Sequence, residues 1–514
     1  MFSKAKSCAV HGVDGRMIDV EADVNDGLPV FTMVGYLSSS VRESSERVRT
    51  ALKNSGFHLP PKRITINLSP ADMRKDGSGY DLAIATAVLL SLGVTAELPM
   101  EQTLVLGELS LDGSIKAIPG VLPMVICARE EGMTSCIVPK ENVQEAALVQ
   151  GISVIGVSSL KETMEYIQGI KEYENTNVEQ PAVDTSEYLY DIDFSDVVGQ
   201  ESIKRGMEIA AAGFHNVLLT GAAGAGKSML AKRLPTILPQ MSFEESLEVT
   251  KIYSVGGMLP PEGGLIHRRP FRAPHHTISE YALIGGGRVP TPGEVSFAHY
   301  GVLFLDELPE FSKPVLEVLR QPLEDRRIRI SRVQASYEFP ADFMFVAAMN
   351  PCPCGNYPDY RRCSCTEQQI RRYQSKVSGP LLDRIDIRME VKGVKQEVLF
   401  SKQKTESSKT IRARVEQARQ MQKDRFAGTG LLFNSQLDGK NLEEYITLSE
   451  EGKRLVLQLF EEQELSVRGV HRVLKLARTI ADLAGSEEIE NAHLQEAAFY
   501  RNQDVFAKEV LYGN

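Results

Sequence analysis

The chain has 514 residues, more than one hydrophobic core usually holds, so its length indicates roughly two to four domains. With 42% hydrophobic and 25% charged residues, its composition is that of a soluble globular protein. The net charge of −10 argues against a surface that binds polyanions throughout, but it leaves room for a local basic channel. The start lacks a secretory signal and the longest apolar run, Leu82 to Leu92, is too short to span a bilayer, so we expect a cytoplasmic protein with no membrane partner.

Residues 1–170 alternate strand and helix patterns and are predicted to form an α/β domain of their own. An Asn-Asp-Gly turn separates the first two predicted strands, and Ser40 with Glu43 forms a predicted capping box for a helix that Gly56 ends. A buried helix is expected at Asp81 to Leu92. The predicted strands are Val10 to Val24, Leu28 to Val34, Arg63 to Leu68, Thr103 to Leu109, Ser135 to Val138 and Ser153 to Val157.

Three short motifs in this domain, Arg74-Lys-Asp-Gly-Ser78, Gly107-Glu-Leu-Ser-Leu-Asp-Gly113 and Val138-Pro-Lys-Glu-Asn142, resemble the proteolytic domain of Lon. The resemblance implies a catalytic serine and lysine, which fall here on Gly79 and Leu122. Ser78 lies one position away, but no lysine is available to activate its hydroxyl. We therefore predict a Lon-like fold that serves assembly or substrate guidance in place of proteolysis.

A glycine-rich turn at residues 221–228 is the strongest motif in the middle of the chain. Residues 171–190 are polar and aperiodic and are predicted to be a linker, after which residues 191–395 form a P-loop core with a parallel sheet. The apolar run Val217 to Leu219 leads into a glycine-rich turn and a helix start, which is the order that a Walker A motif requires. We expect Lys227 to meet the β- and γ-phosphates of ATP or GTP and the Ser228 hydroxyl to hold Mg²⁺. The predicted nucleotide-binding residues are Gly221, Gly224, Ala225, Gly226, Lys227, Ser228, Met229 and Asp306.

Two carboxylates end a second apolar strand, Gly301 to Leu305, in the Walker B arrangement. Asp306 is predicted to support Mg²⁺, and Glu307 to polarise the attacking water. A third strand, Phe343 to Met349, ends at Asn350, which fits the residue called sensor 1 that orients this water.

The segment between the two Walker motifs is rich in Gly and Pro and is expected to form a shaped loop or hairpin. His275 and His276 within it are interpreted as hydrogen-bonding or nucleic-acid contacts in preference to metal ligands. Farther on, Arg327 and Arg329 share one face of a predicted strand. That face is either a solvated edge or a basic hairpin that grips a DNA backbone, and both interpretations remain open.

Four cysteines, Cys352, Cys354, Cys363 and Cys365, form two close pairs around a short polar loop. In a chain without an export signal, such cysteines are better interpreted as reduced thiols or metal ligands than as disulfides. Four thiolates at this spacing predict a Zn²⁺ site, and a reduced loop without metal is the alternative.

Arg384 follows an apolar turn downstream of Asn350, where ring ATPases keep the arginine finger that reaches a neighbour's γ-phosphate. Residues 396–514 are helical in pattern and are expected to form an α-helical lid. Ser466 caps one of its helices, which carries Arg468, our choice for sensor 2, and Arg472, the second choice.

The whole chain resembles the bacterial YifB/ComM family, a magnesium chelatase-like class of AAA+ ATPases. The motifs that carry the resemblance are Phe271-Arg-Ala-Pro-His-His276, Asn350-Pro-Cys-Pro-Cys-Gly355, Ser378-Gly-Pro-Leu-Leu-Asp-Arg384 and Ala477-Arg-Thr-Ile-Ala-Asp-Leu483. The resemblance implies a homo-hexameric helicase that acts on single-stranded or branched DNA, with branch migration in recombination or natural transformation. The alternatives are the motor subunit of a metal chelatase-like complex and a protease, which Gly79 and Leu122 disfavour.

Overall fold

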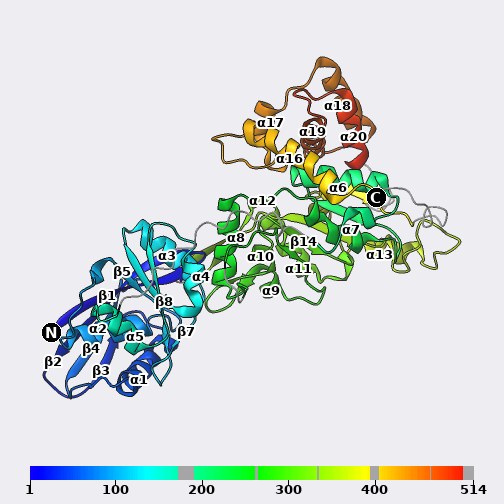
Figure 1. Ribbon diagram of the computed structural model, residues 1–514. Helices are drawn as coiled ribbons and strands as arrows, with labels where there is room; N and C mark the ends of the chain where they lie inside the picture. The colour runs from blue at the N-terminus through cyan, green and yellow to red at the C-terminus, as the bar shows by residue number, and fades with distance from the viewer. Residues whose placement is uncertain (172–189, 261–263, 333–334, 394–404, 464, 502–514) are drawn as a thin grey trace.

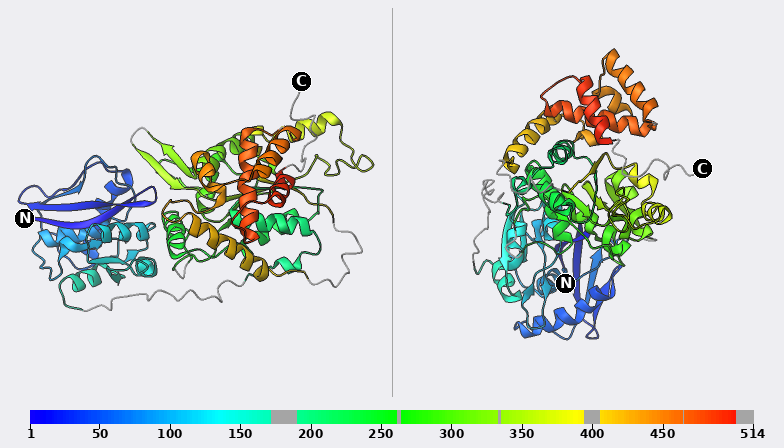
Figure 2. Two further views of the ribbon diagram at one scale, coloured as in Figure 1. Left: turned by 90° about the horizontal axis from the view of Figure 1, so that it is seen from above. Right: turned by 90° about the vertical axis from the view of Figure 1, so that its right-hand side faces the viewer.

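A computed structural model describes residues 1–171, 190–260, 264–332, 335–393, 405–463 and 465–501. The front domain lies at one end, the nucleotide-binding core in the middle, and a group of helices packs on the core (Figure 1). The views in Figure 2 keep this arrangement, with the orange and red helices stacked on the green core. Nearly all of the predicted linker, residues 172–189, lies outside the described residues. None of the described helices has the length and apolarity of a membrane span.

The front domain is built on a seven-stranded sheet of order β3-β4-β2-β1-β5-β8-β9. The predicted strand Val10 to Val24 is in fact the end of one strand and the whole of the next, because Gly12 turns the chain with φ +69°. Ser38, not Ser40, caps the first helix by accepting a hydrogen bond from the Val41 amide. The elements are β1 Phe2–His11, β2 Asp14–Asn25, β3 Phe31–Val34, α1 Ser39–Asn54, β4 Arg63–Ser69, α2 Asp81–Ser91, β5 Thr103–Val105, β6 Glu108–Leu109, β7 Ile115–Lys116, α3 Val121–Glu130, β8 Ser135–Pro139, α4 Val143–Ala146, β9 Ser153–Val157 and α5 Leu160–Ile167.

The core is built on a five-stranded parallel sheet of order β11-β14-β17-β10-β18. Every residue of β10, β14 and β17 is buried, as expected for parallel strands covered by helices on both faces. Since the strands run the same way, the loops after β10, β14 and β17 meet at one edge. The elements are α6 Glu201–Gly213, β10 Val217–Thr220, α7 Lys227–Arg233, α8 Phe243–Val255, β11 Phe271–Arg272, α9 Glu280–Ile284, β12 Gly285–Gly286, β13 Thr291–Pro292, α10 Glu294–Phe297, β14 Val302–Leu305, α11 Lys313–Val318, α12 Arg320–Asp325, β15 Arg327–Ser331, β16 Ser336–Pro340, β17 Met344–Met349, α13 Glu367–Gln374, α14 Gly379–Leu382 and β18 Ile387–Glu390.

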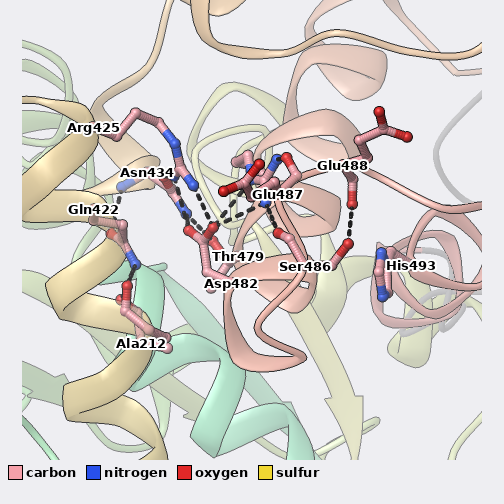
Figure 3. A network of polar contacts seen from close by, with 12 residues as sticks. Ala212, Gln422, Arg425, Asn434, Thr479, Asp482, Ser486, Glu487, Glu488 and His493 are labelled. Atoms are coloured by element: carbon pink, nitrogen blue, oxygen red, sulfur yellow. Dashed lines mark hydrogen bonds and ion pairs between the residues drawn. The ribbon is translucent and has the colours of Figure 1, made fainter.

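The lid consists of helices in its described part, and a polar network around Asp482 joins two of them, α16 Ser408–Arg425 and α19 Val467–Leu483 (Figure 3). The carboxylate of Asp482 accepts hydrogen bonds from Arg425, Arg478 and Asn434 at 2.5–3.1 Å. Gln422 donates to a carbonyl of α6 at 2.9 Å and so ties the lid to the core. The helices are α16 Ser408–Arg425, α17 Gly439–Tyr445, α18 Glu450–Glu462, α19 Val467–Leu483 and α20 Asn491–Arg501.

The positions where Lon-like chemistry would occur are filled by other contacts. A side chain on Gly79 would press against Ile118 at 3.1 Å, and Leu122 is fully buried with its amide bound to Glu145 at 2.8 Å. The Ser78 hydroxyl is bound to the carboxylate of Glu108. No lysine and hydroxyl pair is therefore arranged at these positions for peptide hydrolysis.

The front domain contacts the core directly through α8. The Ser254 hydroxyl donates to the buried Glu145 carboxylate, and the Gly120 amide donates to the Ser254 carbonyl at 3.0 Å. Desolvation by burial raises the pKa of Glu145 above its ordinary value. A second contact stacks the His11 ring on Tyr337 of β16, with ring centroids 4.4 Å apart. The front domain therefore rests on both α8 and the β15–β16 hairpin.

Candidate nucleotide site

The loop between β10 and α7 has the shape of a phosphate cradle. Gly224 and Gly226 adopt φ of +77° and +94°, a region that favours glycine. Gly221 packs so closely that an added Cβ would lie 2.2 Å from the Val391 carbonyl oxygen. The Lys227 ammonium donates to the carbonyls of Gly221 and Ala222 at 2.7 and 2.9 Å, and burial lowers its pKa. The structure thus gathers the predicted loop residues around one end of α7.

The two carboxylates predicted from the Walker B pattern lie beside this loop. The Ser228 hydroxyl donates to Asp306 Oδ2 at 2.5 Å, which brings together two oxygens of the kind that Mg²⁺ prefers. Glu307 adopts a left-handed backbone with φ +52°, and its side chain is 60% exposed. A carboxylate that stands free of the strand in this way can reach a water beside the γ-phosphate.

Two further side chains approach this cluster. Asn350, at the end of β17, accepts a hydrogen bond from the Lys227 ammonium at 3.0 Å, so the predicted sensor 1 side chain faces the phosphate loop. His276 Nδ1 lies 3.9 Å from Glu307 Oε2, a proximity that the sequence did not indicate. The parallel pairing of β11 with β14 brings the loop that carries His276 alongside Glu307.

The three predicted arginines lie at the opposite edge of the sheet, where the strands begin. The Asn216 side chain, just before β10, donates to the Arg384 carbonyl at 2.9 Å. Arg472 pairs with Asp386, just before β18, at 2.7 Å. Arg468 lines the same cavity of about 310 Å³ as Arg384 and Arg472. The structure does not bring any of them to the chain's own phosphate loop, so neither sensor 2 candidate fits a role within its own subunit.

Asp386 is the centre of the charge network at this edge. Burial acts to raise its pKa, but the Arg472 guanidinium and then His215, whose Nδ1 lies 3.3 Å away, outweigh burial and hold it below the ordinary value. Arg384 is also paired, through Glu324 at 2.6 Å. An arginine finger at Arg384 would have to exchange this exposed glutamate for a phosphate.

The four clustered cysteines converge as predicted from their spacing. Their Sγ atoms all lie within 4.8 Å of one another, and three of the pairs are 3.4, 3.6 and 3.8 Å apart. The loop that they form packs on the phosphate loop, since a Cβ on Gly355 would lie 3.4 Å from the Ala223 amide nitrogen.

The two arginines predicted to contact DNA do lie on one face of β15, but they share a single carboxylate as their counterion. Arg327 and Arg329 each pair with Glu338 of the adjacent strand β16, at 2.8 and 2.9 Å. Their role as phosphate contacts stays a prediction, and Glu338 would compete with a phosphate for them.

The comparisons with known proteins agree with this architecture. Residues 193–399 match the family described as magnesium chelatase, subunit ChlI, residues 20–142 match subunit ChlI of Mg-chelatase, and residues 405–501 match the C-terminal part of that subunit. Fold, site and these matches define a magnesium chelatase-like AAA+ protein, a class that implies ATP and Mg²⁺.

The relatives narrow this class further. YifB of Escherichia coli is 41% identical over 500 residues, and competence protein ComM of Haemophilus influenzae is 40% identical over 501 residues, with 96% of each chain covered. The chain therefore belongs to the YifB/ComM family, which confirms the family predicted from its motifs. A shorter similarity, 30% identity over 179 residues, covers 31% of this chain and 32% of Lon protease 2 of Bacillus subtilis.

Proposed function

We propose that the protein is an ATP-hydrolysing DNA motor of the cytoplasm that works as a ring, in the manner of a hexameric helicase or branch-migration factor. The convergence of Lys227, Ser228, Asp306 and Asn350 at one edge of the core sheet carries the ATPase part of the proposal. The DNA part is supported by the 40% identity to a protein named for competence, the state in which a cell takes up DNA.

Each residue at the carboxyl edge has a place in hydrolysis. The amides of the phosphate loop and the Lys227 ammonium would bind the phosphates, and Ser228 with Asp306 would hold Mg²⁺, which neutralises phosphate charge when bound. Glu307 would take up the proton of the attacking water, and Asn350 would orient that water. The His276 side chain faces Glu307 and would position it.

The proposal of a ring is supported by the position of the three predicted arginines, which lie away from the chain's own phosphate loop. Arg384, Arg468 and Arg472 line a cavity of about 310 Å³ at the edge of the sheet away from the chain's own phosphate loop. In a closed ring, head-to-tail contacts place one face of each subunit against a different face of the next. We infer that this cavity faces the neighbour's nucleotide, with Arg384 as the finger and Arg468 or Arg472 as sensor 2.

The cysteine cluster is proposed to bind one Zn²⁺ per chain. Four thiolates around zinc at about 2.3 Å would stand roughly 3.8 Å apart in a tetrahedron, close to the 3.4–3.8 Å of the three pairs among Cys352, Cys354 and Cys363. A bound zinc would keep the cysteine loop packed against Ala223 of the phosphate loop. We therefore expect the Cys352→Ser, Cys354→Ser double variant to lose zinc and to turn over ATP more slowly. Elemental analysis of protein purified under reducing conditions without chelators tests this, and metal-free wild type would refute it.

The deciding experiment measures ATP hydrolysis and strand displacement with single-stranded, duplex and branched DNA. We expect hydrolysis to rise with DNA and a labelled strand to leave a branched substrate. The second candidate is the motor of a metal chelatase-like complex, which the family matches favour by name. That motor would respond to a porphyrin-binding partner and ignore DNA, so the absence of both DNA effects would put it first.

A further inference from the structure

An open groove of about 820 Å³ lies beside α9, between the β12–β13 turn and Arg332, which directly follows β15. Its lining combines an aromatic ring, Tyr281, with two guanidinium groups, Arg288 and Arg332. It belongs to none of the sites described above. The Arg332 guanidinium donates to the Gly287 carbonyl at 3.0 Å, which joins the hairpin to the β12–β13 turn and holds the two cationic elements of the groove together.

Tyr281 is held as an exposed platform. The residue is 68% exposed, yet its ring lies against the backbone of Gly286. A Cβ at Gly286, where φ is +151°, would come within 2.6 Å of the ring, so only glycine allows this approach. A ring fixed in this way and open to solvent has the geometry on which a nucleic-acid base stacks.

The two arginines of the groove can pair with a ligand without giving up a carboxylate partner, in contrast to the arginines on β15. Within the described part of the chain, neither Arg288 nor Arg332 pairs with a carboxylate, whereas Arg327 and Arg329 share Glu338. In a chain with a net charge of −10, two exposed guanidiniums that form no ion pair with a described carboxylate concentrate positive potential at one place. Phosphate groups are the ligands that such a pair recognises.

We propose that this groove binds single-stranded DNA, with a base stacked on Tyr281 and the backbone phosphates on Arg288 and Arg332. The proposal rests on the proposed DNA-motor function and names its contact. Duplex DNA fits less well because its bases are already stacked on one another, so the ring would have no free base face.

The groove lies in the same segment of the chain as His276, so DNA bound at the groove can affect the catalytic glutamate. One segment between β11 and β12 carries His276, which faces Glu307 at 3.9 Å, and then α9 with Tyr281. A bound DNA strand that displaces α9 would also displace His276, because both belong to this segment. DNA binding at the groove should therefore change the rate of hydrolysis.

The test measures the affinity of the full-length protein, in a Glu307→Gln background with ATP, for a labelled oligothymidine strand by fluorescence anisotropy. We expect Tyr281→Ala to weaken binding about 5- to 150-fold and Tyr281→Phe to keep it, because the stacking of one base on an aromatic ring is worth this much. Replacing Arg288 and Arg332 by alanine should lower the slope of log affinity against log salt by about 0.7 for each phosphate that the protein no longer neutralises. Arg454→Ala, an exposed arginine on α18, is the matched control and should change neither quantity.

A second measurement locates the strand directly. Photocrosslinking with an iodouracil-substituted strand should label the peptide that contains Tyr281. If Tyr281→Ala and the arginine variants bind the strand as wild type does, or if crosslinks are confined to β15, this site is wrong. Either result would leave the proposed DNA-motor function in place. If wild type binds no single strand at all, the proposed function itself fails. Tighter binding of an RNA strand of matching sequence would overturn the assignment to DNA.

Discussion

Mixing two inactive variants tests whether Arg384 acts across a subunit boundary. Lys227→Ala removes the ammonium of the phosphate loop, and Arg384→Ala removes the guanidinium at the opposite edge of the sheet. Each variant alone should hydrolyse almost no ATP. If the two residues serve one site from adjacent subunits, an active site forms wherever an Arg384→Ala subunit offers its phosphate loop to a Lys227→Ala neighbour.

The size of the recovery follows from the ring arrangement. In an equal, random mixture each of the two requirements is met at half of the interfaces, so about one quarter of the sites, and about one quarter of wild-type hydrolysis, should return. The control mixes wild type with the Lys227→Ala, Arg384→Ala double variant and should also give about one quarter. Action within one subunit predicts none for the first mixture and about one half for the control.

The assay is steady-state phosphate release after the mixed subunits have been dissociated and reassembled. Recovery near zero in the first mixture, together with about one half in the control, would refute the placement of Arg384 at a neighbour's nucleotide. Co-purification of the second variant with an affinity tag on the first must show that mixed rings form, since unmixed rings would give no recovery for a trivial reason.

Three more predictions concern single side chains. Glu307→Gln should bind ATP but hydrolyse it at least about 100-fold more slowly, whereas Lys227→Ala should lose affinity; equilibrium binding and phosphate release separate the two effects. Asp482→Ala leaves the buried Arg478 and the partly buried Arg425 without their carboxylate and should destabilise the lid by roughly 3–5 kcal/mol, measured by denaturant unfolding. A similar loss in exposed Glu461→Ala would contradict this cause. The folded pKa of Asp386 is lowered, so its carboxylate stabilises the folded protein fully above its unfolded pKa of about 3.9, and this stabilisation is lost as the pH falls through the folded value. Thermal unfolding of Asp386→Asn should lack this acid dependence.

The sequence predicted the elements whose pattern is strong. Core strands β10, β14 and β17 appear as buried apolar runs, and Ser466 caps α19 as expected by accepting from the Gly469 amide. Strand β1 was missed up to Val10 because its buried positions hold Ala5, Ser7 and Cys8, residues too small or polar to give an apolar alternation.

The rest of the candidate site depends on contacts between distant segments. Glu338 pairs with both β15 arginines only through the register of β15 with β16, and His276 reaches Glu307 only because β11 pairs with β14. The edge of the sheet on which Arg472 lies follows from its pairing with Asp386, which no local pattern encodes. Spacing along the chain identified these residue types, but the pairing of strands decides which of them meet.

The contact of the front domain with α8 couples the front domain mechanically to the core. Helix α8 is the pivot, because Ser254 is bound there to Glu145 and Gly120 of the front domain. The N-terminal end of the front domain lies at the tip farthest from the core (Figure 1). If α8 rotated during ATP hydrolysis, the displacement of the front domain would grow with distance from α8 and would be largest at this tip, which holds no nucleotide.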